Sequence, residues 1–235
     1  MPVHHRVTTA AHARPRRSLP RWSRRLATLV LAFAAALPSS AWDAGLMHAA
    51  AQRLGTRALA AVGPLNELLA AARAADDVER LGLINRFFNQ RIAFRPDAEV
   101  WAVADHWTSP LEVLAKGQGD CEDYAIAKFA SLRAAGVAPE RLRLVYVRTR
   151  LPGQPEDQAH MVLAYHVEPG AEPLVLDNLR PEVLPAGQRP DLIPVFSFND
   201  EGLWQGTGST RTGNPLARLS RWREVWGRTL DEGFR

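Results

Sequence analysis

The sequence is poor in cysteine: its 235 residues contain one, Cys121. A single cysteine forms no internal disulfide and cannot build a zinc site made of several thiolates. The phosphate-binding loop of nucleotide-binding proteins, the dinucleotide glycine fingerprint, paired CxxC motifs and internal repeats are also missing. These absences exclude a disulfide-stapled scaffold, a cysteine-rich zinc module and the common nucleotide-binding classes.

Long apolar runs are scarce as well. One covers residues 26–37, whereas a helix that crosses a bilayer needs roughly 20 residues. The 25 residues at the start contain seven arginines and no acid, and Ser39 and Ala41 follow the run at the small-residue positions of a cleavage site. The pattern predicts an export signal over residues 1–41 that is cut after Ala41, a periplasmic location, and one mature domain over residues 42–235.

The basic charge belongs to the leader. The formal net charge of the whole chain is +4, and removing the seven leader arginines changes it to −3. Because the remaining body is mildly acidic, the sequence does not predict a nucleic-acid partner.

Helical periodicity comes first along the mature sequence, and strand-like alternation follows it. Helices are predicted over residues 43–73 with a break at Gly63-Pro64, from Ala75 through Phe88, over residues 121–135 with Gly136 as the C-cap, and near the end through Trp222 and Trp226. Strands are predicted over residues 141–149, 159–167, 174–179 and 192–198, and residues 89–110 are predicted to be irregular or only briefly helical. This order predicts an α+β domain in which N-terminal helices pack on an antiparallel sheet.

Cys121 stands at the start of a predicted helix, after the glycines of Gly117-Gln118-Gly119. The unpaired N–H groups and the dipole at a helix N-terminus favour a thiolate over a thiol. The glycines allow a sharp turn and a close approach to a substrate. The backbone N–H of Cys121 would also suit an oxyanion. Cys121 is therefore a candidate nucleophile, with the backbone of residues 118–120 as a less certain part of the site.

A cysteine nucleophile needs a base and a group that orients the base. His160 opens one predicted strand and Asp177 ends the next. If the two strands form a hairpin that turns within residues 168–171, these two side chains become neighbours, and the carboxylate fixes the imidazole tautomer. The other histidines are weaker candidates by position: His4, His5, His12, His48, His106 and His166.

Several segments carry a family resemblance. The stretch GDCEDYAIAKFASLRAAGV, followed by RLRLVYV, AHMVLAY and LVLDNL, resembles the bacterial transglutaminase-like cysteine proteinases, and among them the LapG-type periplasmic proteases. The resemblance extends over residues 75–204 and implies a papain-like, transglutaminase-like fold with the nucleophile at a helix N-terminus. The family's catalytic cysteine, histidine and aspartate fall on Cys121, His160 and Asp177, and Asn178 is a less certain site member.

The acids around Cys121 have two interpretations. Carboxylates beside a thiolate raise its pKa, and a bound cation would offset them. Clustered carboxylates suit Ca²⁺, and the resemblance implies a calcium-dependent protease whose ligands fall on Asp120, Glu122 and Asp123. Alternatively, these acids only stabilise the helix dipole.

The resemblance also implies a biological role. It points to an exported cysteine endopeptidase that cuts a large cell-surface adhesin near its N-terminus and so releases cells from a biofilm. An inner-membrane cyclic-di-GMP receptor would sequester such a protease. Two alternatives stay open: transglutaminase-type amide transfer onto an amine, and a non-catalytic binding module of the same fold.

Overall fold

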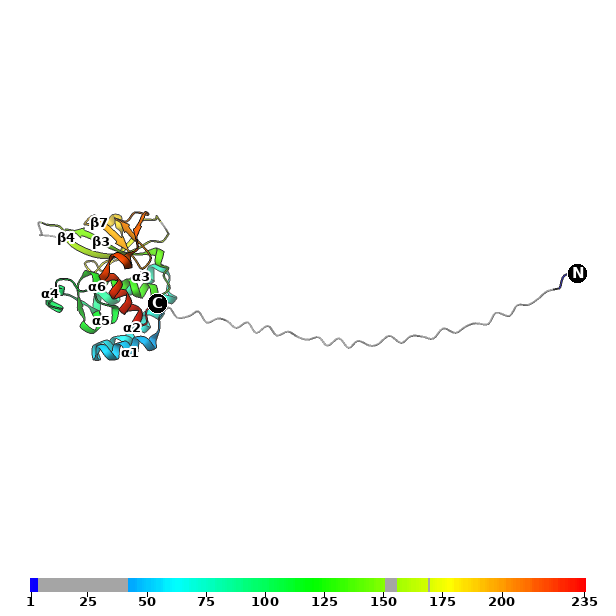
Figure 1. Ribbon diagram of the computed structural model, residues 1–235, viewed down its shortest axis with the longest axis horizontal. Coiled ribbons are helices and arrows are strands. Elements are labelled where there is room, and N and C mark those ends of the chain that lie inside the picture. Colours follow the sequence, from blue (N-terminus) through cyan, green and yellow to red (C-terminus); the bar gives the residue numbers. More distant parts are fainter. Residues whose placement is uncertain (4–41, 151–155, 169) are drawn as a thin grey trace. The chain divides into compact units, whose positions relative to one another are not determined.

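The computed structural model describes residues 1–3, 42–150, 156–168 and 170–235 (Figure 1). Residues Ser39–Arg235 form one compact unit. Nearly all of the predicted export signal, including the cleavage site at Ala41, lies outside the described residues. Within the described ranges, no helix combines the length and the apolar character that a membrane span requires.

Helices make up most of the first half of this unit. They are α1 (Ala44–Leu54), α2 (Thr56–Ala74), α3 (Asp77–Arg91), α4 (Asp97–Val100), α5 (Pro110–Lys116) and α6 (Cys121–Ala134). The chain later forms the 3-10 turns η1 (Pro139–Arg141) and η2 (Ala186–Gln188), and it ends with α7 (Pro215–Arg218) and α8 (Ser220–Asp231).

The predicted break at Gly63-Pro64 is wrong. The first helical region breaks at Gly55, whose φ of 107° lies in the region that favours glycine. Helix α2 then continues through Pro64, which costs it one backbone hydrogen bond. The next residue, Leu65, and Leu69 one turn later are fully buried. Their packing in the core outweighs the cost of the proline.

The strands form one large sheet and one small one. They are β1 (Ala93–Phe94), β2 (Gln118–Gly119), β3 (Leu142–Thr149), β4 (Gln158–Tyr165), β5 (Leu174–Leu176), β6 (Leu184–Pro185), β7 (Leu192–Phe198), β8 (Leu203–Gln205) and β9 (Arg211–Gly213). The 7-stranded sheet has the order β6-β5-β4-β3-β7-β8-β9, and its neighbouring strands pair antiparallel. The predicted α+β class with an antiparallel sheet is confirmed.

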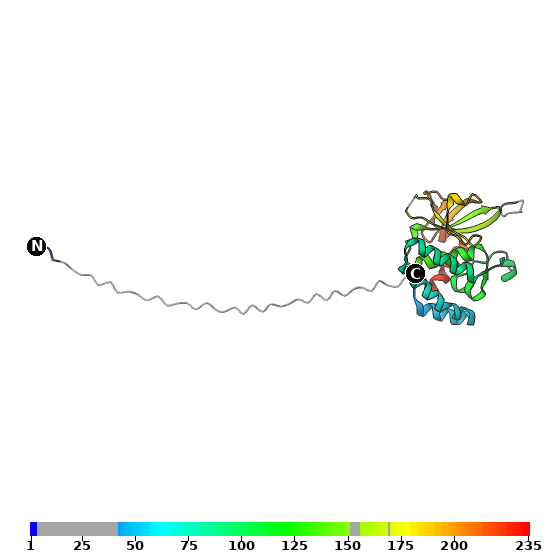
Figure 2. The same cartoon turned by 180° about the vertical axis from the view of Figure 1, so that it is seen from behind.

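The core lies between one face of this sheet and the helices, as both views of the ribbon show (Figures 1 and 2). Helix α6 packs against α3 on one side and against β4 on the other. Phe129 on α6, Phe198 on β7 and Trp222 on α8 are fully buried, and the rings of both phenylalanines pack edge-on against the Trp222 ring. Because α6 is enclosed in this way, its first residue is held firmly against the sheet.

Candidate active site

Cys121 is the first residue of α6. The chain reaches it through β2, which pairs in parallel with β1. Gly117 ends α5 with a φ of 63°, which favours glycine. A Cβ at Gly119 would collide with the Asp123 carboxylate, so the short strand requires glycine there. The two glycines thus let the chain turn tightly between two helices and present Cys121 at a helix N-terminus.

Asp123 ties the start of α6 to the segment before α5. Its Oδ1 accepts hydrogen bonds from the Thr108 N–H at 2.8 Å and from the Thr108 hydroxyl at 2.6 Å. Its Oδ2 accepts from the Asp120 N–H at 3.2 Å. Burial raises the pKa of Asp123 to about 7, although the hydrogen bonds from Thr108 oppose the shift. Asp123 therefore has a structural task in addition to any ligand role.

The structure brings His160 and Asp177 together. Strands β4 and β5 pair antiparallel with Leu163 opposite Leu176, so Asp177, which directly follows β5, lies beside the middle of β4. The Nε2 atom of His160 lies 2.8 Å from Oδ1 of Asp177, and both side chains are buried. Since Nε2 is occupied by the carboxylate, Nδ1 is the ring nitrogen left for another partner.

Arg189 is a site residue that the sequence did not indicate. Its guanidinium donates to Oδ2 of Asp177 at 2.7 Å and also pairs with Asp191 at 2.8 Å. The Leu179 N–H donates to Oδ1 of Asp177 at 3.1 Å. Burial acts to raise the pKa of Asp177, but the hydrogen bond and charge of His160, followed by Arg189, outweigh it and hold the pKa at about 2. Asp177 is thus ionised, and these hydrogen bonds hold its carboxylate in one orientation.

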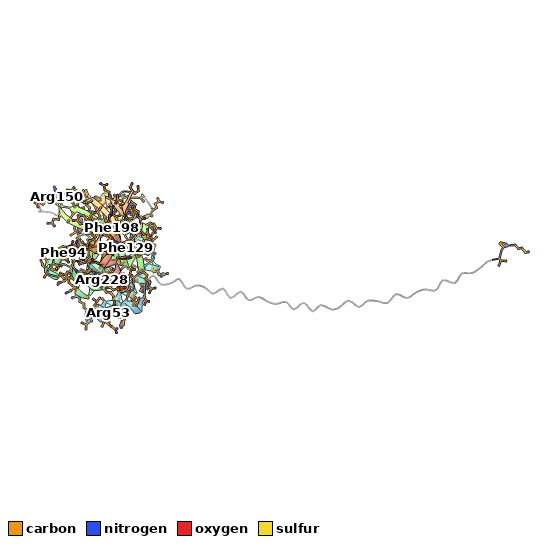
Figure 3. The ribbon with its side chains drawn as sticks, viewed as in Figure 1. Arg53, Phe94, Phe129, Arg150, Phe198 and Arg228 are labelled. Carbon is orange, nitrogen blue, oxygen red and sulfur yellow. The ribbon has the colours of Figure 1, made fainter. Side chains whose placement is uncertain are left out.

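Cys121 and His160 line the same cleft, which has a volume of about 310 Å³. Its walls include Phe94, Trp107 and Tyr146, and Figure 3 shows Phe94 on the margin of the domain. A cleft with aromatic walls and two polar reactive groups can hold an extended peptide.

The sulfur of Cys121 sits among carboxylates. Sγ donates to Oε2 of Glu122 at 3.0 Å. Burial, and then the charge and hydrogen bond of Glu122 together with the charge of Asp120, raise the pKa of the Cys121 thiol. Burial and Asp120 also raise the pKa of Glu122 to about 9. With carboxylates alone around it, the sulfur is held as a thiol.

The acids form a larger cluster than the three predicted ones. Oxygen atoms of Asp97, Asp120 and Asp123 lie within 4.8 Å of one another, and so do those of Asp97, Asp105 and Glu122. Oδ1 of Asp97 and Oδ1 of Asp120 are buried without a hydrogen-bond partner among the described residues. Unsatisfied carboxylate oxygens in an all-oxygen cluster fit a hard cation such as Ca²⁺. Asp97 and Asp105 lie in a segment whose acidity is visible in the sequence, but no spacing rule joins them to Cys121.

Among the less certain candidates, Gln118, Asn178, His106 and His166 are not among the residues that line the cleft. Gln118 is exposed on β2. Asn178 follows Asp177, and its Oδ1 is buried without a hydrogen-bond partner in the described ranges. The Nδ1 atom of His166 lies 3.2 Å from the Ala171 carbonyl, at the far end of β4 from His160. The His106 ring packs on Trp101.

Comparisons with known proteins show what this chain is similar to. The model of the family described as bacterial transglutaminase-like cysteine proteinase (BTLCP) matches residues 65–207. The structure of Legionella pneumophila LapG in its EGTA-treated form has 34% sequence identity and a TM-score of 0.69, over 80% of this chain and 97% of that chain. Its calcium-bound form has 35% identity and a TM-score of 0.66, over 79% and 98% of the two chains. A search of curated proteins gave no match.

Proposed function

This chain belongs to the bacterial transglutaminase-like cysteine proteinases, and from that premise we propose that Cys121, His160 and Asp177 are its catalytic nucleophile, base and orienting acid. One observation carries the assignment: the buried 2.8 Å contact with Asp177 holds the histidine that lines the same cleft as the chain's single cysteine. The match with the structure of Legionella pneumophila LapG covers 80% of this chain.

The proposed chemistry is acyl transfer through a thioester. Asp177 holds Nε2 of His160, so the imidazole takes the Cys121 thiol proton on Nδ1. The sulfur attacks the scissile carbonyl carbon, and the peptide C–N bond breaks as the imidazolium returns the proton to the leaving amine. Water then attacks the thioester, His160 again takes and returns a proton, and the acid product leaves. The Cys121 N–H, in the first turn of α6, supports the oxyanion.

Calcium is the proposed cofactor. The residues that would hold it are the five acids of the cluster: Asp97, Asp105, Asp120, Glu122 and Asp123. The buried Oδ1 atoms of Asp97 and Asp120 have no hydrogen-bond partner in the described part of the chain. A relative, Legionella LapG, has a calcium-bound structure. When bound, the cation would supply positive charge beside Cys121 and connect the start of α6 to the segment that follows β1.

The proposed substrate is a large cell-surface adhesin, cut near its N-terminus so that cells leave a biofilm. The support is the likeness to Legionella LapG together with a cleft of about 310 Å³ that Cys121 and His160 line. An inner-membrane cyclic-di-GMP receptor is the proposed sequestering partner on the same ground. The leader features of residues 1–41 support export to the periplasm. The test is to sequence the N-terminus of protein recovered from the cell envelope, which should start at Trp42.

The decisive experiment for the substrate uses an N-terminal fragment of a candidate adhesin from the same cell. Purified protein should cut it once in the presence of calcium, and Cys121→Ala should not. Adding a labelled primary amine separates hydrolysis from amide transfer, because transfer would attach the label to the new C-terminus. An uncut fragment would reject the adhesin as substrate, while cleavage by Cys121→Ala would reject the nucleophile.

A further inference from the structure

The guanidinium of Arg189 lies between two carboxylates. Its Nη2 atom donates to Oδ2 of Asp177 at 2.7 Å and to Oδ2 of Asp191 at 2.8 Å, and its Nε atom donates to Oδ1 of Asp191 at 3.0 Å. The side chains of Arg189 and Asp177 are 2% and 0% exposed, whereas that of Asp191 is 31% exposed. The two hydrogens of Nη2 thus go to different acids, one inside the proposed triad and one outside it.

Asp191 fixes the plane of the guanidinium. Its two oxygens accept from two neighbouring nitrogens of Arg189, and such a bidentate contact sets the orientation of an arginine as well as its position. Asp177 receives a single bond from the same group, about which the guanidinium could turn. The hydrogen bond from Arg189 lowers the pKa of Asp191, while partial burial opposes the shift. Asp191 is therefore ionised at neutral pH and holds Arg189 as a charged, bidentate partner.

A tight turn brings Asp191 back onto Arg189. The Leu192 N–H donates to the Arg189 carbonyl at 3.1 Å, and Pro190 occupies the second position of this four-residue turn. Proline is favoured at that position because its φ is already fixed near the value that the turn needs. The side chain of Asp191, at the third position, is thereby kept close to the guanidinium.

Both ends of this turn are attached to the face of the large sheet that lies opposite the helices. The side chains on that face form a separate apolar cluster, whose members are Val145, Val147, Val162, Ala164 and Val175. Ala186 on η2 and Leu192 at the start of β7 pack against it. The Arg189 N–H donates to the Ala186 carbonyl at 2.9 Å, and Leu192 pairs with Thr149 of β3. The segment that carries Arg189 and Asp191 is thus fixed to the sheet on which His160 stands.

We propose that Asp191 is a positioning residue of the protease, which acts through Arg189 to hold the Asp177 carboxylate in the orientation that His160 requires. The inference rests on the proposed roles of His160 and Asp177. In the series Asp191, Arg189, Asp177 and His160, no contact between neighbours is longer than 3.0 Å. Without Asp191 the guanidinium keeps its bond to Asp177 but loses its fixed plane. The carboxylate and the imidazole then adopt more orientations, and fewer of them place Nδ1 at the thiol.

Asp191→Asn tests the proposal, because asparagine keeps the size of the side chain, suits a turn and removes the charge and one acceptor. Two rates are measured with calcium present: alkylation of Cys121 by iodoacetamide, and cleavage of the N-terminal adhesin fragment at several concentrations. The alkylation rate and kcat should fall by about 3- to 10-fold with little change in KM. Alkylation needs no substrate, so it decides the question if the fragment is not cut.

The matched control is Glu182→Gln. Glu182 is an exposed acid that lines the same cavity as Asp191, and its variant should keep the alkylation rate and kcat of the parent. A merely structural ion pair would give a lower melting temperature in Asp191→Asn, with both rates equal to those of the control. That result would overturn the proposal.

A double-variant cycle shows whether Asp191 acts through Arg189. Once Arg189 is methionine, Asp191 has nothing to position, so Arg189→Met combined with Asp191→Asn should match Arg189→Met alone within about twofold. Independent effects would multiply. A double variant that is slower by a further factor of about 3 to 10 would therefore contradict the proposed path through Arg189.

Failure of this inference is separable from failure of the proposed triad. If Asp191→Asn equals the control while Cys121→Ser is inactive, the triad stands and only the role of Asp191 is rejected. Full cleavage by Cys121→Ser would instead reject the triad, and the role of Asp191 with it. If Asp191→Asn does not fold, Asp191→Ser, which also places a small polar residue in the turn, takes its place in each measurement.

Discussion

Asp177 is the residue on which the hydrogen bonds of the site converge. It accepts from His160, Arg189 and the Leu179 N–H, and its own carbonyl accepts from Asn89. A buried carboxylate with three donors is stable only as an anion, which explains why its pKa is held at about 2 despite burial. The orientation of His160 therefore depends on residues that never reach the cleft.

Arg189→Met tests this dependence. The variant removes the donor to Oδ2 and leaves Asp177 free to turn, so kcat should fall by about 10- to 100-fold with little change in KM. The measurement is peptide cleavage at several substrate concentrations. Arg180→Met is the matched control, because Arg180 is exposed three residues after Asp177. Equal kcat values for both variants would contradict the role of Arg189.

The same variant has a consequence for stability at low pH. A lowered carboxyl pKa contributes stability in full above its unfolded value of 3.8, and that contribution is lost as the pH falls through about 2. Without Arg189 the pKa of Asp177 rises, so acid unfolding should begin at a higher pH. Unfolding followed between pH 2 and 5 by circular dichroism shows the difference.

The sequence indicated some of these residues and not others, for a physical reason. Cys121 carries local signals, namely the preceding glycines and the helix start. His160 and Asp177 follow from strand pairing at short range. Arg189 lies in no motif, since its contact with Asp177 depends on how the segment between β6 and β7 folds back over β5. In the sequence Lys128 looks like an ordinary polar residue of a helix. Its burial follows only from the packing of α6 between other helices and the sheet.

Helix α5 shows how one element is held by another that is distant in the chain. Ser109 caps it, and the Glu112 side chain accepts from the Ser109 N–H at 2.8 Å. From the end of α8, Glu232 accepts from the Ser109 hydroxyl and from the Leu111 N–H at 3.1 Å. Burial raises the pKa of Glu232 to about 8. The C-terminal helix thereby completes the N-terminus of the helix that precedes the Cys121 loop.

Glu232→Gln tests this connection through its pH dependence. A raised carboxyl pKa contributes stability below its unfolded value of 4.5, and this contribution is lost as the pH rises through about 8. Glutamine resembles the protonated acid at every pH. The variant should match the parent at pH 5 and exceed its unfolding free energy by roughly 1–3 kcal/mol at pH 9. Urea denaturation at both pH values measures this.

The control for that experiment is Glu224→Gln, an exposed site on the same helix. It should follow the parent at both pH values. If Glu232→Gln also follows the parent, Glu232 is not the buried acid that links α8 to α5.

Element boundaries could be predicted where local chemistry sets them. Helix α6 and strands β3, β4 and β7 lie close to the predicted ranges. The sequence patterns did not predict helix α5, although Ser109 and Glu112 have the capping-box spacing that is typical of a helix start. Strands β6, β8 and β9 have two or three residues each, too few for alternation to be visible. They form because the neighbouring strands have free backbone N–H and C=O groups at their edges, with which these short segments pair.

In the domain as a whole, the acid cluster around Cys121 lies at the start of α6, the helix that packs on the large sheet. The acids of the cluster come from α4, from the segment after it and from the residues at the start of α6, so a cation there would connect these three parts of the chain. Without a cation, the repulsion between these carboxylates and the burial of their oxygens work against the fold.

Calcium should therefore stabilise the whole domain. At 100 times its dissociation constant it adds about 2.7 kcal/mol, which for a domain of this size raises the melting temperature by about 5–10 °C. EGTA should reverse the shift, and Mg²⁺ should be a poor substitute because it needs a tighter octahedral shell. Differential scanning calorimetry measures the shift.

Two variants and a control make this specific. Asp97→Asn and Asp120→Asn should lose most of the calcium shift, since each carries an unsatisfied buried oxygen. Glu140→Gln removes an exposed acid on η1 and should keep the full shift. If neither calcium nor EGTA changes the melting temperature, the calcium proposal fails, and the acids only stabilise the helix dipole.

The central claim is that Cys121 is a nucleophile activated by His160 and Asp177, and alkylation tests it most directly. The chain has one cysteine, so iodoacetamide labelling followed by mass spectrometry reports on Cys121 alone. With calcium present near neutral pH, the parent should label quickly and lose peptide cleavage in step with labelling, while His160→Gln and Asp177→Asn should label at least about tenfold more slowly. Slow labelling of the parent, together with full cleavage by Cys121→Ser, would contradict the claim.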